Sequence, residues 1–372
     1  MTGEQQVGAN PMVQEIPVSF PSSDGCVRLA GTLAVPPEGR AAPAVILVSG
    51  TGPIDREVTF VGHTLFRTMA YALARGGIAS LRFDKRGVGE SEGDFSSAKP
   101  EDFFADVLGA REYLLTQEGF TAEHVGLLGH SEGGMVALTA AARAPRTAFC
   151  VSLAGPLLSG RDNVVQSFAL LARGGLQRDS EFDRYVSELD TLFEIARSGT
   201  PSVRQPEAEE LATSLAPRIF TERTQVILGT NQLSGAEFLR LLSSACLDTV
   251  WGWDPMQIVP RVICPVLVLY GAKDVQVPAA ENIAAGRALV EKLGKSGWTI
   301  REVADLNHAF QRCQTGMPEE YAGLDHVMAD EVVEEVVAWI KARTHLEGND
   351  TVGSLFTARS GRHNKPPPMV EP

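Results

Sequence analysis

The chain has 372 residues, enough for one large α/β domain with an insertion. Hydrophobic residues make up 44% of it, so a full core can form, and the formal net charge is −13. Because like charges repel, this charge argues against binding to nucleic acid or to an anionic membrane surface.

The cysteines and the opening residues indicate the cellular compartment in which we expect the protein. The five cysteines are odd in number, and they show neither a C-x-x-C pair nor the spacing of metal ligands. The opening sequence MTGEQQ lacks the basic and apolar regions of a signal peptide, and no apolar run is long enough to span a bilayer. We therefore expect a cytoplasmic protein with reduced thiols, no membrane segment, and no metal or other cofactor. The cysteines are Cys26, Cys150, Cys246, Cys264 and Cys313.

Strands and helices are predicted to alternate over the first part of the chain. Alternating polarity over 13–20 and 27–35, with Asp24-Gly25 between them, predicts a hairpin. The continuous apolar run at 44–48 is typical of a strand buried on both faces of a sheet, and further strands are predicted at 78–83, 125–128 and 148–153. Apolar residues at helical spacing predict helices over 63–75 and around 103–114, and a helix of small residues follows over 134–142. This alternation predicts an α/β fold with a doubly wound, mainly parallel sheet.

The alternation stops near residue 157. Residues 157–250 are rich in Arg, Glu, Leu and Ser at helical spacing, with one weak strand-like run at 226–228. Strands at 266–270 and 298–303 and helices at 280–293 and 330–342 then resume the earlier pattern. We predict an α/β core in two parts (12–156 and 251–346), an inserted helical cap (157–250), and a disordered, proline-containing tail (347–372).

The segment GHSEG at 129–133 lies where a predicted strand meets a predicted helix. A serine at such a junction needs a sharp turn, and glycines two residues to either side let the neighbouring backbones approach closely. The turn lifts the hydroxyl clear of the sheet and places the first helical N–H groups beside it. The pattern predicts Ser131 as a nucleophile, with a plain structural turn as the alternative.

A serine nucleophile needs a base, and the base needs a carboxylate that fixes its tautomer. Asp274 and His308 each follow a predicted strand, as Ser131 does, and the carboxyl ends of parallel strands are where such sheets bind ligands. The order Ser…Asp…His along the chain is also the order found in α/β-hydrolases.

Five segments carry a resemblance to the α/β-hydrolases, and within them to bacterial serine esterases related to dienelactone hydrolases and acyl-CoA thioester hydrolases. They are GTGPIDR at 50–56, DKRGVGES at 84–91, GHSEGG at 129–134, GAKDVQVP at 271–278 and LNHAFQ at 306–311. The resemblance covers roughly residues 25–345 and implies the α/β-hydrolase fold, with Ser131 as nucleophile, Asp274 as acid and His308 as base. Dienelactone hydrolases use a cysteine in place of Ser131, so their substrate does not carry over.

An oxyanion hole needs two hydrogen-bond donors. We expect the backbone N–H groups of Glu132 and Thr51 in these roles, although the loop around Thr51 also fits a simple glycine turn. Asp55 and Arg56 touch the substrate or, as we favour, brace their own loop. Asp305 is a rival for the triad acid, but its Asp-Leu-Asn setting is more typical of a turn.

Four further residues are candidates for the substrate pocket. His63 follows the loop of Thr51, Phe310 follows His308, and Trp251 and Trp253 flank the return from the insertion, where they also fit a core role. We expect His130, inside the turn of Ser131, to be packed and hydrogen-bonded. Some apolar residues of the insertion are expected to face the acyl group rather than to pack only on the sheet. These are Leu157, Phe168, Leu171, Phe193 and Phe238.

The function that we predict is a serine hydrolase acting on a small-molecule carboxylic ester or thioester through an acyl-enzyme. A peptidase or amidase, or an enzyme that removes an acyl group from a secondary metabolite, would use the same triad. A non-catalytic scaffold that binds a ligand is the alternative outside enzymes, and the presence of all three triad residues argues against it.

Overall fold

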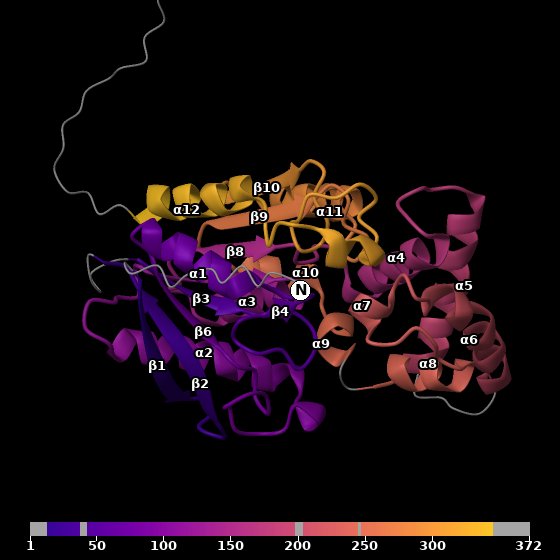
Figure 1. The fold of residues 1–372 in the computed structure, drawn as a ribbon, viewed down its shortest axis with the longest axis horizontal. Helices are drawn as coiled ribbons and strands as arrows, with labels where there is room; N and C mark the ends of the chain where they lie inside the picture. The colour runs from indigo at the N-terminus through magenta and orange to yellow at the C-terminus, as the bar shows by residue number, and fades with distance from the viewer. Residues whose placement is uncertain (1–12, 38–42, 198–203, 245–246, 345–372) are drawn as a thin grey trace, which may run out of the picture.

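The computed structural model describes residues 13–37, 43–197, 204–244 and 247–344. At its centre is an eight-stranded sheet in the order β1-β2-β6-β3-β7-β8-β9-β10 (Figure 1). β2 pairs antiparallel with both β1 and β6, and all the other neighbours in this sheet are parallel. The strands are β1 (Gln14–Pro21), β2 (Arg28–Val35), β3 (Ala44–Val48), β6 (Ala79–Phe83), β7 (Val125–His130), β8 (Cys150–Leu153), β9 (Val266–Gly271) and β10 (Trp298–Val303). A separate pair, β4 (Thr59–Phe60) and β5 (His63–Thr64), lies in the loop after β3.

Continuous apolar sequence made the central strands recognisable because both faces of the sheet are covered. Every residue of β3, β6, β7, β8 and β9 is buried. The buried cores on the two faces are distinct: helices α1 (Leu65–Arg75) and α12 (Asp330–Thr344) contribute to one, and α2 (Pro100–Thr116), α3 (Glu132–Arg143) and α11 (Ala279–Lys292) to the other. The predicted α/β fold class is therefore confirmed.

The segment between β8 and β9 is helical, as the sequence indicated. The helices are α4 (Gly160–Arg173), α5 (Ser180–Arg197), α6 (Gln205–Ile219), α7 (Gln225–Leu228), α8 (Gly235–Leu242), α9 (Asp248–Trp251) and α10 (Pro255–Ile258), followed by the short 3₁₀ turn η3 (Val259–Arg261). Outside this segment, short 3₁₀ turns are η1 (Phe95–Ser97) and η4 (Pro318–Gly323). The weak strand expected at 226–228 is wrong, because these residues form the turn of α7, which Gly229 ends in a left-handed conformation. The predicted tail at 347–372 lies outside the described residues.

Helices α4, α5, α6 and α8 gather at one side of the sheet and have a hydrophobic core of their own (Figure 1). The ring of Phe168 lies 5.9 Å from that of Phe193 and 5.8 Å from that of Phe238, measured between centroids. Phe193 in turn stacks on Trp251 at 5.0 Å. Leu171 belongs to the same core, whereas Leu157 packs in the sheet core against β10 and α11. All five side chains are packed in these two hydrophobic cores, and the expectation that some of them face an acyl group stays a prediction.

The core of the helical insertion also reaches the sheet edge that carries the predicted site. Val275 and Met317, which follow Asp274 and His308 in the chain, are both buried in it. A hydrogen bond from Asn163 of α4 to the Gln276 carbonyl adds a polar contact at 3.3 Å. The insertion is thus packed against the segments that follow the two predicted triad residues.

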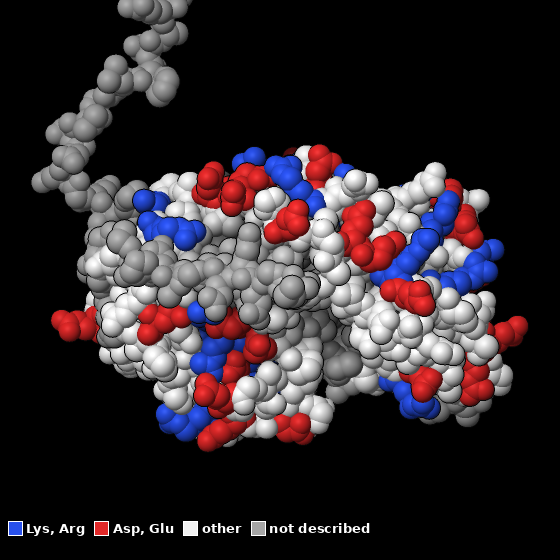
Figure 2. Space-filling view, in the orientation of Figure 1, with Lys and Arg blue, Asp and Glu red and all other residues white. Residues whose placement is uncertain are grey.

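Two properties of the described residues bear on the predicted partners. None of their helices combines the length and the apolar character needed to cross a membrane. Figure 2 shows basic and acidic side chains interspersed on the face in view, with no large surface of a single sign.

Candidate active site

Ser131 occupies the sharp turn between β7 and α3. Its φ angle is +57°, a left-handed value that is rare outside glycine, and its N–H donates to the Leu153 carbonyl of β8 at 2.8 Å. The flanking glycines explain how the chain tolerates this turn. A Cβ atom at Gly129 would lie 1.9 Å from the Gly133 oxygen, and one at Gly133 would lie 2.0 Å from the Val48 oxygen. The backbones of β3, β7 and α3 therefore meet at this turn as the GHSEG pattern predicts.

Asp274 and His308 come together beyond the ends of β9 and β10. The His308 Nδ1 lies 2.7 Å from Asp274 Oδ2, and both side chains are buried. The other carboxylate oxygen, Oδ1, accepts the N–H groups of Gln276 at 2.8 Å and of Val277 at 2.9 Å. Because both oxygens are occupied, the carboxylate is fixed and imposes one orientation on the imidazole.

His130 links the turn of Ser131 to His308. Its Nε2 lies 2.9 Å from the His308 carbonyl oxygen, and the two imidazole centroids are 4.9 Å apart. Burial, with a smaller contribution from the charge of His308, lowers the pKa of His130 to about 3. A carbonyl can only accept, so neutral His130 donates its Nε2 proton. The expected packed and hydrogen-bonded role of His130 is confirmed.

The loop after β3 approaches Ser131 closely at Gly50. A Cβ atom at this position would lie 3.3 Å from both the Ser131 Cβ and the His130 oxygen. Thr51, the next residue, is exposed, whereas Glu132 is buried at the start of α3. Gly50, which precedes Thr51, and Glu132, which follows Ser131, therefore both lie next to the Ser131 turn.

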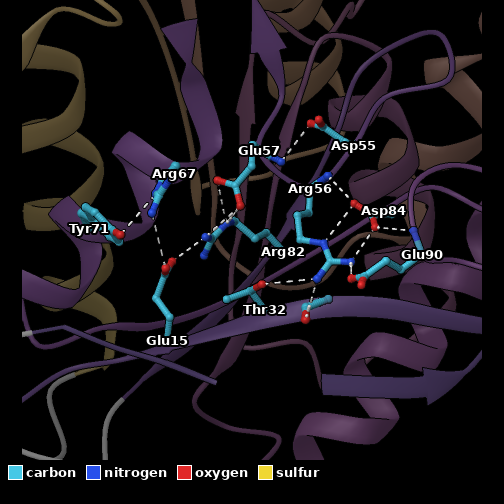
Figure 3. Close-up of polar contacts among 11 residues, drawn as sticks. Glu15, Thr32, Asp55, Arg56, Glu57, Arg67, Tyr71, Arg82, Asp84 and Glu90 are labelled. Atoms are coloured by element: carbon cyan, nitrogen blue, oxygen red, sulfur yellow. Dashed lines mark hydrogen bonds and ion pairs between the residues drawn. The ribbon is translucent and has the colours of Figure 1, made fainter. Parts of the chain in front are cut away.

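Ionic contacts brace this loop, as Figure 3 shows. Arg56 donates from Nε and Nη2 to the two carboxylate oxygens of Asp84, at 3.0 and 2.5 Å, and also pairs with Glu90 at 2.7 Å. Burial raises the pKa of Asp84, but the hydrogen bonds from Arg56 and from the Glu90 backbone outweigh it and leave this pKa below its ordinary value. Arg56 thus braces the loop, which is the role we favoured from the sequence.

The next residue of the loop is braced in the same way. Glu57 pairs with Arg82 of β6 at 3.0 Å, and Arg82 also contacts Glu15 of β1 at 2.5 Å (Figure 3). The Asp55 carboxylate accepts the Glu57 N–H at 3.1 Å, so it too supports the loop. Sequence reasoning gives no role to Arg82, nor to Asp84 and Lys85, which belong to the DKRG segment at 84–87.

The rival acid, Asp305, lies apart from His308. Its side chain is 62% exposed and pairs with Lys273 at 2.8 Å, a contact that lowers its pKa. Asp305 has a φ angle of +60°, a turn conformation that its Asp-Leu-Asn setting indicated.

The four candidate pocket residues differ in their surroundings. Phe310 is fully buried, and its ring meets that of His130 edge-on at 6.5 Å. Trp253 is buried in the sheet core, and Trp251 stacks on Phe193 in the core of the insertion. His63, half-buried in β5, places Nε2 3.1 Å from the Leu324 carbonyl oxygen. The surroundings of both tryptophans match the core role that the sequence also allowed.

The four cysteines within the described residues take no part in this arrangement, and Cys246 lies outside those residues. Cys26, Cys150, Cys264 and Cys313 are all free thiols. Within the described ranges, no three His, Cys, Asp or Glu side chains are grouped so that they would hold a metal ion.

The sheet order and the glycine-flanked turn of Ser131 are those of an α/β-hydrolase fold. A sequence model described as the alpha/beta hydrolase family matches residues 45–338, and the chain belongs to this family.

Known proteins with similar sequences include hydrolases. Esterase EstD of Thermotoga maritima is 25% identical over 326 residues, which cover 87% of this chain and 68% of EstD. Thiohydrolase apmlB of Arthrinium phaeospermum is 26% identical over 222 residues, which cover 56% of this chain and 68% of apmlB. Among solved structures, the alpha/beta hydrolase GrgF from Penicillium sp. sh18 matches with a TM-score of 0.53 at 20% identity, over 89% of this chain and 99% of GrgF. The last comparison shows a shared fold.

Proposed function

We propose that the protein is a serine hydrolase that cleaves a small carboxylic ester or thioester through an acyl-enzyme. Ser131 is the nucleophile, His308 the general base and acid, and Asp274 the residue that orients His308. The observation that carries the proposal is the buried 2.7 Å contact between Asp274 and His308, at the same sheet edge as the strained Ser131 turn. The names of two similar proteins, an esterase and a thiohydrolase, support the substrate class.

The first half of the reaction acylates Ser131. The neutral His308 keeps its proton on Nδ1 and donates a hydrogen bond from there to Asp274, which leaves the Nε2 lone pair free for the serine hydroxyl. Ser131 Oγ attacks the carbonyl carbon as Nε2 accepts its proton, and the carbonyl π electrons move onto oxygen. When the tetrahedral intermediate collapses, the bond to the alcohol or thiol breaks, and that group leaves with the proton from Nε2.

The second half of the reaction restores the enzyme. His308 removes a proton from water, whose oxygen attacks the acyl carbon, and collapse of the new intermediate releases the carboxylic acid and returns the proton to Ser131. In both halves the negative oxygen is held by the N–H groups of Glu132 and Thr51. The proximity of Gly50 to Ser131 supports Thr51 in this role, since Gly50 and Thr51 share one peptide unit.

The helical insertion is assigned the role of a cap over this site. The support is its packing on Val275 and Met317, which follow the acid and the base in the chain. A cap of this kind excludes water while the acyl-enzyme exists and limits the size of the acyl group.

The test combines labelling with a substrate panel. A fluorophosphonate probe is expected to add one label to the wild type and none to Ser131→Ala, because only an activated serine reacts. The panel pairs esters, thioesters and peptide amides that carry the same acyl groups, and we expect turnover of esters or thioesters that depends on Ser131. Equal labelling of the two proteins, or turnover of the amides alone, would refute the proposal.

A further inference from the structure

Lys85 is a buried cation that the proposed mechanism does not use. It follows β6 in the DKRG segment, and 9% of its side chain is exposed. The ammonium lies over the rings of Phe103 and Phe95, at 5.0 and 5.7 Å from their centroids. Burying an ammonium in such surroundings costs free energy unless its polar partners compensate, so its partners indicate what it does.

The closer of its two polar partners is the Gly50 carbonyl. Lys85 Nζ donates to this oxygen at 2.5 Å, whereas its nearest carboxylate oxygen, Glu132 Oε2, is 3.6 Å away. Both partners are connected with the proposed oxyanion hole, because Glu132 and the peptide between Gly50 and Thr51 carry its two proposed donors. One ammonium therefore contacts the peptide that carries one proposed donor and the side chain of the residue that carries the other.

The planarity of the peptide bond gives the Gly50 contact its consequence. The described chain has no cis peptide, and in a trans peptide the C=O and the following N–H point in opposite directions. When Lys85 holds the Gly50 oxygen on one side, the Thr51 N–H must point to the other. The proposed role of Thr51 requires that side to face Ser131, against which Gly50 lies.

This peptide also needs to be held. Its plane turns about a bond of Gly50 on one side, and glycine offers little resistance to such a rotation. Arg56 and Glu57 are tied to β6 through Asp84 and Arg82, but these contacts act further along the loop. The bond from Lys85 acts on the rotating peptide itself.

We infer that Lys85 is a positioning residue of the oxyanion hole, which aligns the Thr51 N–H through the Gly50 carbonyl. The inference rests on the proposed function, because it needs an ester or thioester whose carbonyl oxygen becomes an anion. The positive charge of Lys85, held next to the Gly50 carbonyl oxygen, also polarises the peptide and makes the Thr51 N–H a stronger donor.

The test compares Lys85→Met with the wild type on an ester and on the matching thionoester, whose C=S sulfur accepts hydrogen bonds weakly. Removal of a whole oxyanion donor lowers kcat about 10²–10³-fold, so loss of its alignment is expected to lower kcat for the ester about 10–100-fold. The value of KM should stay within about twofold, because the interaction belongs to the transition state. The thionoester should lose much less, so the ratio of ester to thionoester turnover falls.

Two further variants separate alignment from a merely structural role. Lys295→Met is the matched control, because Lys295 also holds backbone carbonyls, those of Pro260 and Val262 at 2.9 and 2.6 Å. It should leave kcat and the ester-to-thionoester ratio unchanged. If Lys85→Met misfolds because Glu132 is left as an unpaired buried carboxylate, the double variant Lys85→Met/Glu132→Gln removes both charges and is assayed in its place.

The outcomes distinguish this inference from the proposed function. A wild type that cleaves neither esters nor thioesters through Ser131 overturns the proposed function. An active wild type with a folded Lys85 variant whose ester-to-thionoester ratio is unchanged overturns only the inference. A selective fall in that ratio, absent from the Lys295 control, supports it.

Discussion

Replacement of Asp274 by asparagine tests the proposed triad through one hydrogen-bond pattern. In the wild type, Oδ1 accepts two backbone N–H groups and Oδ2 accepts from His308. The asparagine has one oxygen and one NH₂ group, and the two N–H donors fix the oxygen at the Oδ1 position. The NH₂ group must then face Nδ1 and donate to it. His308 would carry its proton on Nε2, where it can no longer accept one from Ser131.

The expected loss is large because the wrong tautomer dominates. In the serine proteases this change lowers kcat about 10⁴-fold, which corresponds to about 5.5 kcal/mol of transition-state stabilisation. We expect a loss of the same order for Asp274→Asn, measured on the best ester or thioester of the panel. Circular dichroism and a thermal melt should show that the variant is folded.

Asp305→Asn is the matched control, since Asp305 is the other aspartate near His308 in the chain. Its side chain is 62% exposed and contacts Lys273 rather than the imidazole. Its activity should stay within about twofold of the wild type, because an exposed ion pair contributes little. If Asp305→Asn lost more activity than Asp274→Asn, or if Asp274→Asn kept wild-type kcat, the assigned acid would be wrong.

Three further predictions concern the structure around the site. Gly133→Ala should prevent stable folding, because its Cβ would lie 2.0 Å from the Val48 oxygen, whereas Gly323→Ala, with no atom within 4 Å, should melt like the wild type. The lowered pKa of His130, about 3 against 6.5 when unfolded, means that the unfolded chain binds a proton first as the pH falls. Between pH 8 and pH 5 this should remove about 2 kcal/mol from the free energy of unfolding, a loss that urea titrations should find absent from His130→Gln. Phe238→Ala should cost about 3–5 kcal/mol of stability, because the ring is fully buried, while the preference for acyl length stays unchanged; a shift in that preference would place the ring in the pocket.

The sequence by itself determined the sheet and the sharp turn that carries Ser131, the proposed nucleophile. Continuous apolar runs identified strands such as β3 because a strand covered on both faces has no polar positions to interrupt it. GHSEG identified the Ser131 turn because backbone atoms of the turn and of the neighbouring strand come so close to Gly129 and Gly133 that no side chain fits there. Asp274 and His308 each follow a predicted strand, and the structure brings them together beyond the strand ends.

The tertiary structure decided which side chains occupy the space between these elements. The sequence offered Phe168, Phe193 and Phe238 as pocket residues, but the helices of the insertion pack on one another and use these rings as their core. Helical periodicity shows that a face is apolar, and it does not show what covers that face. The contact between Lys85 and Gly50 was likewise hidden, because it joins residues 35 positions apart through a backbone oxygen. Every residue has such an oxygen, so only the folded chain shows which one a buried lysine holds.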